Sequence, residues 1–356
     1  MFDRIGADGY EQVVYCHDRA TGLRAIIAIH STRLGPALGG TRFYPYPSED
    51  AALEDVLRLA KGMTYKAAAA GLDLGGGKAV ILGDPAVDRS EALIRAYGRF
   101  VDSLGGRYVT AEDVGTTQDD MDLIRRETTA VTGVSMELGG SGDPSEATAH
   151  GVLWAMKAVA GRLWGSTALD GRHVVVSGVG KVGSVLAGLL LEEHARLTVA
   201  DIAPAAVDRL ASESGVEVAP VESAHAVPCD IFSPCALGGV LDTVRIPELR
   251  CAAVVGSANN QLADPSCAKL LADGGIVYAP DYVVNAGGVI NIAEELSPQG
   301  YHQERAYASV RRIFETTGRV LATAEAEGVT TAEAADRIAE RRMDEVGHVR
   351  NIRTFK

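Results

Sequence analysis

The second half of the chain alternates short apolar runs with helical segments, and this alternation constrains the fold more than any other feature. The runs that we interpret as strands are His173–Ser177, Arg196–Asp201, Asp230–Ser233, Ala252–Gly256 and Gly275–Ala279. Parallel strands need a long crossover connection, usually a helix, whereas antiparallel strands can be joined by a short turn. The alternation therefore predicts a parallel sheet with helices on both faces.

A glycine-rich turn follows the first of these strands and precedes an apolar helix. It reads Gly178-Val179-Gly180-Lys181-Val182-Gly183, and we expect the whole turn, Lys181 and Val182 included, to hold a cofactor. In dinucleotide-binding proteins such glycines permit a tight turn, close approach of the pyrophosphate and helix packing. Asp201, at the end of the next strand, would bind ribose hydroxyls and repel a 2′-phosphate, so NAD is expected rather than NADP. A purely structural turn is the alternative.

The stretch from 63 to 78, MTYKAAAAGLDLGGGK, holds two lysines, Lys66 and Lys78. A continuous helix would keep them roughly 18 Å apart, but the glycines favour a chain reversal. A reversal brings the two ammonium groups together, and adjacent, partly buried cations lower each other's pKa. A lysine of lowered pKa can act as a base near neutral pH. The alternative is two solvated lysines around a loop.

The first part of the chain predicts an α/β unit. Glu11–Asp18 and Leu23–Ser31 are predicted to form an antiparallel pair, and Leu34–Arg42 is predicted to be a loop because it is rich in turn residues. Ser48 is a good N-cap for the helix that leads to Lys66, and Lys78–Leu82 is a short predicted strand.

A pair of carboxylates, Glu112 and Asp113, follows a strand predicted at Arg107–Ala111 and precedes a glycine turn. Carboxylates in that position often lie in the mouth of an α/β site. The segment Gly139–Ser145 is rich in Gly, Ser and Pro, so we interpret it as a domain boundary.

Composition excludes several classes of function. The net charge of −13 argues against nucleic acid or an anionic membrane as the main partner, and neither a membrane span nor a signal peptide is evident. Five cysteines without a CxxC pair favour a cytoplasmic protein with reduced thiols. Cys229 and Cys251 border predicted strands and are expected to be buried structural residues. Histidine is sparse, so no protein metal site is expected.

Ordered motifs across nearly the whole chain resemble the bacterial amino-acid dehydrogenases of the Glu/Leu/Phe/Val family, above all its leucine and valine branch. These motifs are LGPALGGTR at 34–42, MTYKAAAAGLDLGGGKAVI at 63–81, RYVTAEDVGT at 107–116, GVGKVG at 178–183, FSPCALGG at 232–239, GSANNQLA at 256–263 and YAPDYVVNAGGVIN at 278–291. The resemblance implies an α/β fold of two domains. A substrate-binding, catalytic domain would span 1–135, with a C-terminal helix at about 330–356 returning to it. A Rossmann-type NAD-binding domain would span 136–329.

The resemblance also implies a reaction and roles for individual residues. The reaction is oxidative deamination, in which an L-amino acid, NAD⁺ and water give a 2-oxo acid, NADH and ammonia. By likeness to the family, Lys66 binds the substrate carboxylate, Lys78 activates water, and Asp113 moves a proton to or from the nitrogen. Gly39 and Gly40 would let the backbone approach the substrate carboxylate. Family members form homodimers or larger assemblies, so a homo-oligomer is expected.

Further positions match the family near the nicotinamide amide and the substrate amine, namely Thr148, Asn260 and Asn285. Turn and cap chemistry is the alternative for each of them. His150 matches no functional position and is interpreted as a packing or surface residue.

Three apolar residues indicate the substrate. Leu38 stands where the glutamate branch has a lysine for the distal carboxylate, Ala111 stands where phenylalanine-specific members often have Gly, and Val289 resembles the leucine and valine branch. A branched aliphatic amino acid, valine or leucine, is therefore expected. Phenylalanine is the alternative substrate, and a non-catalytic, dinucleotide-dependent amino-acid sensor is the alternative from another class.

Overall fold

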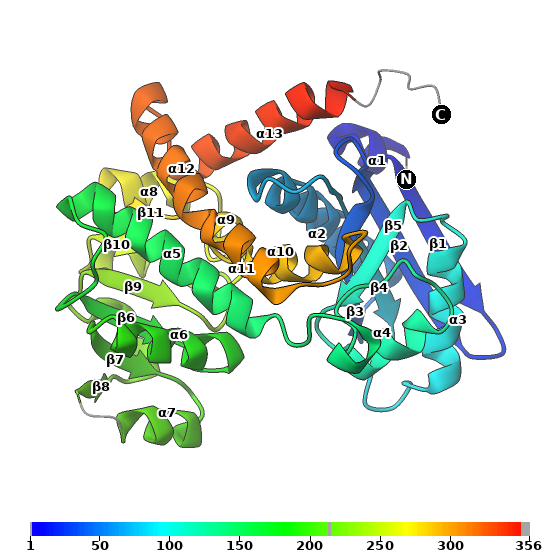
Figure 1. Ribbon diagram of the computed structural model, residues 1–356, viewed down its shortest axis with the longest axis horizontal. Helices are drawn as coiled ribbons and strands as arrows, with labels where there is room; N and C mark the ends of the chain where they lie inside the picture. Colours follow the sequence, from blue (N-terminus) through cyan, green and yellow to red (C-terminus); the bar gives the residue numbers. More distant parts are fainter. Residues whose placement is uncertain (1, 213–214, 350–356) are drawn as a thin grey trace. The chain divides into compact units, whose positions relative to one another are not determined.

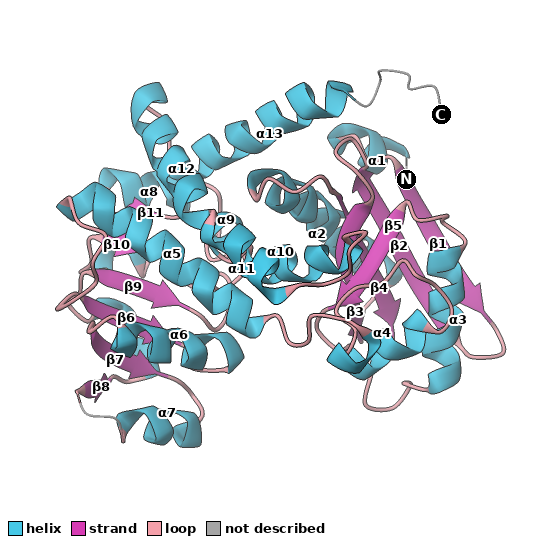
Figure 2. Cartoon of the chain, viewed as in Figure 1, coloured by secondary structure: helices cyan, strands magenta, loops and turns pink. Residues whose placement is uncertain are grey.

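The computed structural model describes residues 2–212 and 215–349, which form two compact units (Figure 1). Unit 1 comprises the described residues up to Asp143, Ile292–Gln303 and those from Ala339 onward. Unit 2 comprises Pro144–Asn291 and Glu304–Ile338. Both units combine helices with a sheet (Figure 2), as the sequence predicted.

The sheet of unit 1 is mixed. Its strands, in the order β1-β2-β4-β3-β5, are β1 (Gln12–Asp18), β2 (Leu23–Ser31), β4 (Gly75–Leu82), β3 (Ala37–Tyr44) and β5 (Tyr108–Glu112). The predicted antiparallel pairing of the first two strands is confirmed, and β2 also runs antiparallel to β4. Strand β3 pairs in parallel with β4 and β5, so the carboxyl ends of those three strands lie at the same edge of the sheet.

Helices cover the two faces of this sheet. The helical elements of the unit are α1 (Phe2–Asp8), α2 (Glu49–Ala69), α3 (Glu91–Asp102), α4 (Gln118–Arg125), η1 (Met136–Leu138), η4 (Glu294–Leu296) and the C-terminal part of α13 (Thr331–Val349). Ser48 caps α2 by accepting a hydrogen bond from the Ala51 N–H. The apolar face of α2 packs on Ile26 and Val80, whereas Tyr97 of α3 forms a hydrogen bond with Thr41 from the other face.

The predicted loop at 34–42 was wrong, whereas the predicted chain reversal between Lys66 and Lys78 is confirmed. Most of the expected loop at 34–42 is strand β3. The chain reverses between α2 and β4 with Gly71 at a φ of 75°, while Gly75–Gly77 belong to β4. A Cβ on Gly39 would overlap the carbonyl oxygen of Gly77, and one on Gly76 would overlap the backbone of Thr64. These glycines permit close approach of neighbouring elements and do not mark turns.

The sheet of unit 2 is parallel throughout, as predicted. Its order is β11 (Val277–Tyr278), β10 (Ala253–Val254), β9 (Ile231–Pro234), β6 (His173–Ser177), β7 (Arg196–Ala200) and β8 (Val216–Val218). The first strand, β6, has β9 on one side and β7 on the other. This is the doubly wound arrangement, and ligands bind such sheets beyond the carboxyl ends of the strands, where the strand order reverses.

The remaining helices belong mainly to unit 2 (Figure 1). They are α5 (Ser145–Trp164), α6 (Lys181–Glu192), α7 (Pro204–Ala211), η2 (Val221–Ala226), η3 (Ile246–Glu248), α8 (Cys267–Asp273), α9 (Asp281–Val284), α10 (Gly287–Ala293), α11 (Gln303–Arg311) and α12 (Ile313–Glu327). Among the residues described, no helix combines the length and the apolar character that crossing a membrane requires.

The division into units differs from the predicted boundaries at residues 136–143, which belong to unit 1, at 330–338, which belong to unit 2, and at a third segment. Residues 292–303, which the sequence-based division placed in the NAD-binding domain, belong to unit 1. Glu295 accepts hydrogen bonds from the backbone N–H groups of Gly133 (3.0 Å) and Ser141 (2.9 Å), which ties this segment to the first unit. Burial raises the pKa of the Glu295 carboxyl. Such a contact between distant segments leaves no local pattern in the sequence.

Candidate active site

The centre of the candidate site in unit 1 is an ion pair between Lys78, on β4, and Asp113, directly after β5. Lys78 Nζ lies 2.8 Å from Asp113 Oδ2, and the two side chains are 9% and 23% exposed. The strand between them, β3, has Gly40 at this level, paired with Ala111 of β5. A Cβ on Gly40 would lie only 3.0 Å from the Asp113 Cβ. The missing side chain therefore leaves room beside β3 for Asp113 and for the backbone of Glu112.

Arg42 is a second cation on Asp113, and its role was not foreseen from the sequence. Its Nε lies 3.2 Å from Asp113 Oδ2, and its Nη1 lies 2.8 Å from Asp55 Oδ2. Tyr46 donates a hydrogen bond of 2.6 Å to Asp55 and so supports this arrangement. Burial raises the pKa of the Asp113 carboxyl, but the charges of Lys78 and Arg42 outweigh burial and lower that pKa to about 2. Asp113 is therefore anionic at neutral pH.

Lys66 lies partly buried in the last turn of α2, which packs on the strands that carry the ion pair. Met63, one turn earlier, has its Cγ 3.3 Å from the position of a Cβ on Gly39. The two predicted lysines thus come from packed elements, α2 and β4. Their action on a common substrate remains a prediction.

The predicted substrate residues Leu38 and Ala111 are both buried. Leu38 pairs with Gly76 of β4, and Ala111 pairs with Gly40 of β3. Side chains of paired residues in parallel strands project from the same face, and alternate residues of one strand share a face. Leu38, Ala111 and Lys78 therefore share the sheet face that α2 covers.

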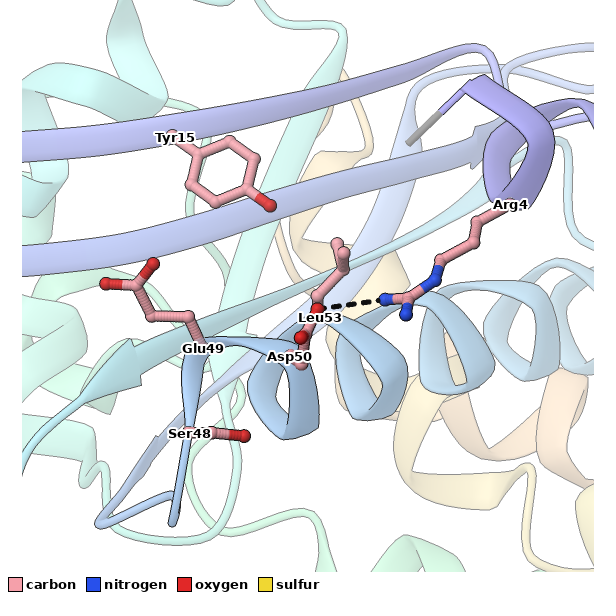
Figure 3. Close-up of a pocket in the computed structure, with 6 residues that line it drawn as sticks. All are labelled: Arg4, Tyr15, Ser48, Glu49, Asp50 and Leu53. Atoms are coloured by element: carbon pink, nitrogen blue, oxygen red, sulfur yellow. Dashed lines mark hydrogen bonds and ion pairs between the residues drawn. The ribbon is translucent and has the colours of Figure 1, made fainter.

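A separate cavity of about 400 Å³ in unit 1 is not part of this site (Figure 3). It is lined by residues from α1, β1 and the start of α2, namely Arg4, Tyr15, Ser48, Glu49, Asp50 and Leu53. Arg4 and Asp50 form an ion pair of 3.1 Å across it, with side chains 54% and 82% exposed. Exposed ion pairs of this kind contribute little energy, and we assign no function to the cavity.

In unit 2, the glycine turn after β6 has the shape that a pyrophosphate requires. Gly178 adopts a positive φ of 102°, and a Cβ there would lie 2.6 Å from the backbone nitrogen of Ala236. A Cβ on Gly183 would overlap the carbonyl oxygen of Gly178. Gly180, by contrast, borders open space at the N-cap of α6. Lys181 and Val182 begin α6, whose N-terminal N–H groups favour a phosphate.

Asp201 lies beside this turn, directly after β7. Its Oδ2 accepts a hydrogen bond from the Val179 N–H at 2.7 Å, and its Oδ1 accepts one from the Ala203 N–H at 2.8 Å. A carboxylate oxygen can accept more than one hydrogen bond, so Asp201 can hold the turn and still accept bonds from hydroxyl groups. The glycine turn and Asp201 together fit a dinucleotide.

The loop after β10 brings Asn285 and the neighbourhood of Asn260 together. Asn285 Nδ2 donates to the carbonyl of Ser257 at 3.0 Å and to Asn259 Oδ1 at 2.8 Å. Within the described residues, Asn285 Oδ1 is buried and has no hydrogen-bond partner, and such an atom is suited to accept from a ligand amide. Asn260 has a positive φ of 52°, an uncommon conformation that often occurs at functional sites.

Thr148 and Val289 lie where α5 meets α10. A Cβ on Gly288 would lie 2.7 Å from Thr148 Oγ1, and Val289 next to it is buried. Thr148 Oγ1 donates to the carbonyl of Pro144 at 2.9 Å. A hydrogen bond of this kind at the start of a helix is the cap chemistry that the sequence left open as the alternative role of Thr148. A role for Thr148 toward the cofactor therefore remains a prediction.

Gln261 is a further residue that sequence reasoning missed. It is completely buried, and its Nε2 donates to the carbonyls of Gly256 (2.7 Å) and Ala258 (3.0 Å). It therefore shapes the loop that presents Asn260. Gln261 and Arg42 both lie within motifs that carried the family resemblance, and that was the available signal for each.

The doubly wound sheet with its glycine turn and acidic residue, together with a buried lysine–aspartate pair, defines a dinucleotide-dependent oxidoreductase. Two family models match the chain. The "Glu/Leu/Phe/Val dehydrogenase, dimerisation domain" model matches residues 10–130, and the "Glutamate/Leucine/Phenylalanine/Valine dehydrogenase" model matches residues 139–209 and 198–350. The chain belongs to the Glu/Leu/Phe/Val dehydrogenase family and is an amino-acid dehydrogenase that uses a nicotinamide dinucleotide.

Named relatives are similar over nearly the full length. A leucine dehydrogenase of Geobacillus stearothermophilus is 53% identical over 99% of this chain and 95% of its own. A valine dehydrogenase of Streptomyces virginiae is 55% identical over 95% of this chain and 94% of its own. Among solved structures, L-tryptophan dehydrogenase of Nostoc punctiforme matches with a TM-score of 0.87 and 42% identity, covering 98% of this chain and 100% of that one.

Proposed function

We propose that this chain catalyses the reversible, NAD-dependent oxidative deamination of a branched aliphatic L-amino acid, valine or leucine. The observation that carries the proposal is the Lys78–Asp113 ion pair, which joins a base and a proton carrier at 2.8 Å. The names of the relatives, leucine dehydrogenase and valine dehydrogenase, support the substrate class. We assign substrate binding and catalysis to unit 1 and NAD binding to unit 2.

The cofactor assignment rests on the glycine turn and Asp201. Gly180 leaves open space at the N-terminus of α6, where backbone N–H groups would hold the pyrophosphate. When bound, the nicotinamide ring accepts a hydride from the substrate Cα. Asp201 would accept bonds from the ribose hydroxyls and repel a 2′-phosphate, which selects NAD. Asn285, whose amide oxygen has no hydrogen-bond partner among the residues described, would receive the nicotinamide amide, and Thr148 and Asn260 would lie near it.

The residues of unit 1 then carry the proton chemistry. Lys66 binds the substrate carboxylate, assisted by the close backbone of Gly39 and Gly40. Loss of the hydride leaves an imino acid, and Lys78 removes a proton from the water that attacks its carbon. Asp113, having taken a proton from the substrate ammonium before hydride transfer, returns it to the nitrogen of the hydrated intermediate. The carbon–nitrogen bond then breaks as the hydroxyl proton passes back to Asp113, and ammonia and the 2-oxo acid leave.

Apolar side chains set the substrate class in this proposal. Leu38 offers no charge to the distal carboxylate of glutamate, and an unpaired buried carboxylate costs several kcal/mol. Ala111 narrows the pocket relative to glycine. Val289 of unit 2 has a stiff, branched side chain and resembles the leucine and valine branch. Valine and leucine differ by one methylene, which is worth about 1–3 kcal/mol in an apolar pocket, so both are expected to react.

Aromatic amino acids are the second candidate, favoured by the 42% identity to an L-tryptophan dehydrogenase. The kcat/KM values for valine, leucine, isoleucine, phenylalanine, tryptophan and glutamate, followed by NADH absorbance, decide between the candidates. We expect valine or leucine to rank first and glutamate to give no appreciable turnover. A higher value for either aromatic substrate would replace the aliphatic assignment. No turnover with any of them would favour the amino-acid sensor.

Assembly and location complete the proposal. We expect a homodimer or larger homo-oligomer, because the model that matches residues 10–130 is named a dimerisation domain and a similar glutamate dehydrogenase structure from Thermus thermophilus is described as hetero-hexameric. Multi-angle light scattering of the full chain tests this, and a monomer at micromolar concentration would refute it. A cytoplasmic location is proposed from the reduced thiols expected of the sequence.

A further inference from the structure

Cys229 and Cys251 lie side by side at the amino ends of two neighbouring parallel strands. The register of β9 and β10 pairs Ile231 with Ala253, and Cys229 and Cys251 each stand two residues before that pair. The backbone agrees, because the Cys229 N–H donates to the Arg250 carbonyl at 3.0 Å. Both cysteines are free thiols, and both are only partly buried.

The two side chains also interact. Each is packed against the apolar core cluster of this sheet. A hydrogen bond with the Cys251 thiol raises the pKa of Cys229, and the same bond lowers the pKa of Cys251. The hydrogen bond therefore favours the thiolate form of Cys251 over that of Cys229.

The backbone geometry suits a covalent bond. Neighbouring strands lie about 4.7–4.9 Å apart, and disulfides join Cα atoms about 4.4–6.8 Å apart. The remaining cysteines are placed differently, with Cys16 on β1 of unit 1, Cys235 beyond the carboxyl end of β9, and Cys267 on α8. The pair lies at the edge of the sheet opposite the glycine turn and Asp201, so it is distinct from the cofactor site.

We propose that Cys229 and Cys251 form a redox-sensitive pair that closes to a disulfide when a peroxide oxidises it. The Cys251 thiolate attacks one peroxide oxygen, the oxygen–oxygen bond breaks, and one water leaves after protonation. The Cys229 sulfur then displaces the hydroxyl of the resulting sulfenic acid, and the second water leaves. The peroxide is reduced and the two thiols are oxidised. The disulfide links the chain just before β9 to the chain just before β10 and closes the residues between them into a loop. Such a crosslink stabilises unit 2 against unfolding.

Hydrogen peroxide is the probe that tests the pair. The full-length protein is treated with it, alkylated with iodoacetamide, digested without reductant and analysed by mass spectrometry. We expect a peptide linked through Cys229 and Cys251 that dithiothreitol abolishes, and an oxidised form whose Tm lies about 5 °C above that of the reduced form. Alkylation of both cysteines after treatment, a link through any other cysteine, or an unchanged Tm would overturn the proposal.

Single substitutions separate the two steps. In Cys229→Ser the link must be lost while dimedone, a sulfenic-acid reagent, labels Cys251. In Cys251→Ser both the link and that label must be lost. Cys235→Ser is the matched control, which removes another partly buried thiol and must retain the link. Labelling of Cys229 in place of Cys251 would contradict the assigned order, and loss of the link in Cys235→Ser would contradict the pairing.

Discussion

Lys78 Nζ lies 2.8 Å from Asp113 Oδ2 although the two residues come from strands that are separated by β3. Gly40 of β3 lies beside this pair, and a Cβ there would lie 2.4 Å from the Glu112 carbonyl oxygen and 3.0 Å from the Asp113 Cβ. Gly40→Ala is therefore expected to separate the pair and lower activity about as much as loss of Lys78. Gly62→Ala is the matched control, because a Cβ at Gly62 of α2 meets no neighbouring atom. Full activity of Gly40→Ala would show that the pair does not need this space.

Lys66 is predicted to act in binding. Lys66→Ala should raise KM for the amino acid by about 100-fold and change kcat much less, because it removes a charge that holds the substrate carboxylate in both ground and transition states. Initial rates over a range of leucine concentrations measure both constants. Lys61→Ala, which removes an exposed lysine of the same helix paired with Asp8, should leave both unchanged. An unchanged KM for Lys66→Ala would exclude the assigned role.

The ion pair should make stability depend on pH in the acid range. The pKa of Asp113 is about 2 in the folded protein against an ordinary 3.8. Because the folded-state value is the lower one, the carboxylate stabilises the fold fully above 3.8, and this contribution of about 2 kcal/mol is lost as pH falls from 3.8 toward 2. Urea unfolding between pH 2 and 5 should show a steeper acid loss in the natural protein than in Asp113→Asn. Identical slopes would contradict the depressed pKa.

Arg42 should control that pKa without contacting the substrate. Removing its charge in Arg42→Met should raise the pKa of Asp113 above about 2, because one of its two cationic partners is lost. Arg58→Met is the matched control, since Arg58 binds Asp55 and has no ion pair with Asp113 in the described part of the chain. Carbon-13 NMR of labelled aspartate carboxyl groups measures the value. If both substitutions change the pKa of Asp113 equally, the low pKa belongs to the charged group of Arg42, Asp55 and Arg58 together and not to Arg42 alone.

Asp201 should determine the choice of cofactor. The natural protein is expected to use NAD at least tenfold better than NADP in kcat/KM, because a 2′-phosphate would lie next to the carboxylate. Asp201→Ser should reduce this preference for NAD and also weaken the binding of NAD, because the hydrogen bond from the Val179 N–H to Asp201 is lost. Equal use of NAD and NADP by the natural protein would refute the assignment.

How far the sequence predicts this molecule depends on the range of the interactions involved. The parallel sheet of unit 2 and the capping by Ser48 follow from local periodicity and cap chemistry, and both were predicted. Strand β3 was mistaken for a loop because its glycines are required by close contacts with residues that are distant in sequence, such as the contact of Gly39 with Gly77. The contact of Arg42 with Asp113 and the return of Glu295 to Gly133 are also long-range, and local patterns do not encode them. Motif resemblance gave the candidate residues, whereas the structure gave their partners.

The most direct test of the account is the rate of NADH formation from L-leucine by Lys78→Ala, with NADH binding measured in parallel by fluorescence. If Lys78 activates the attacking water, kcat should fall by a factor of about 100 to 10,000 while the affinity for NADH stays within twofold of the natural protein. Near-full turnover in Lys78→Ala, with cofactor binding intact, would contradict the central claim that this lysine carries the chemistry.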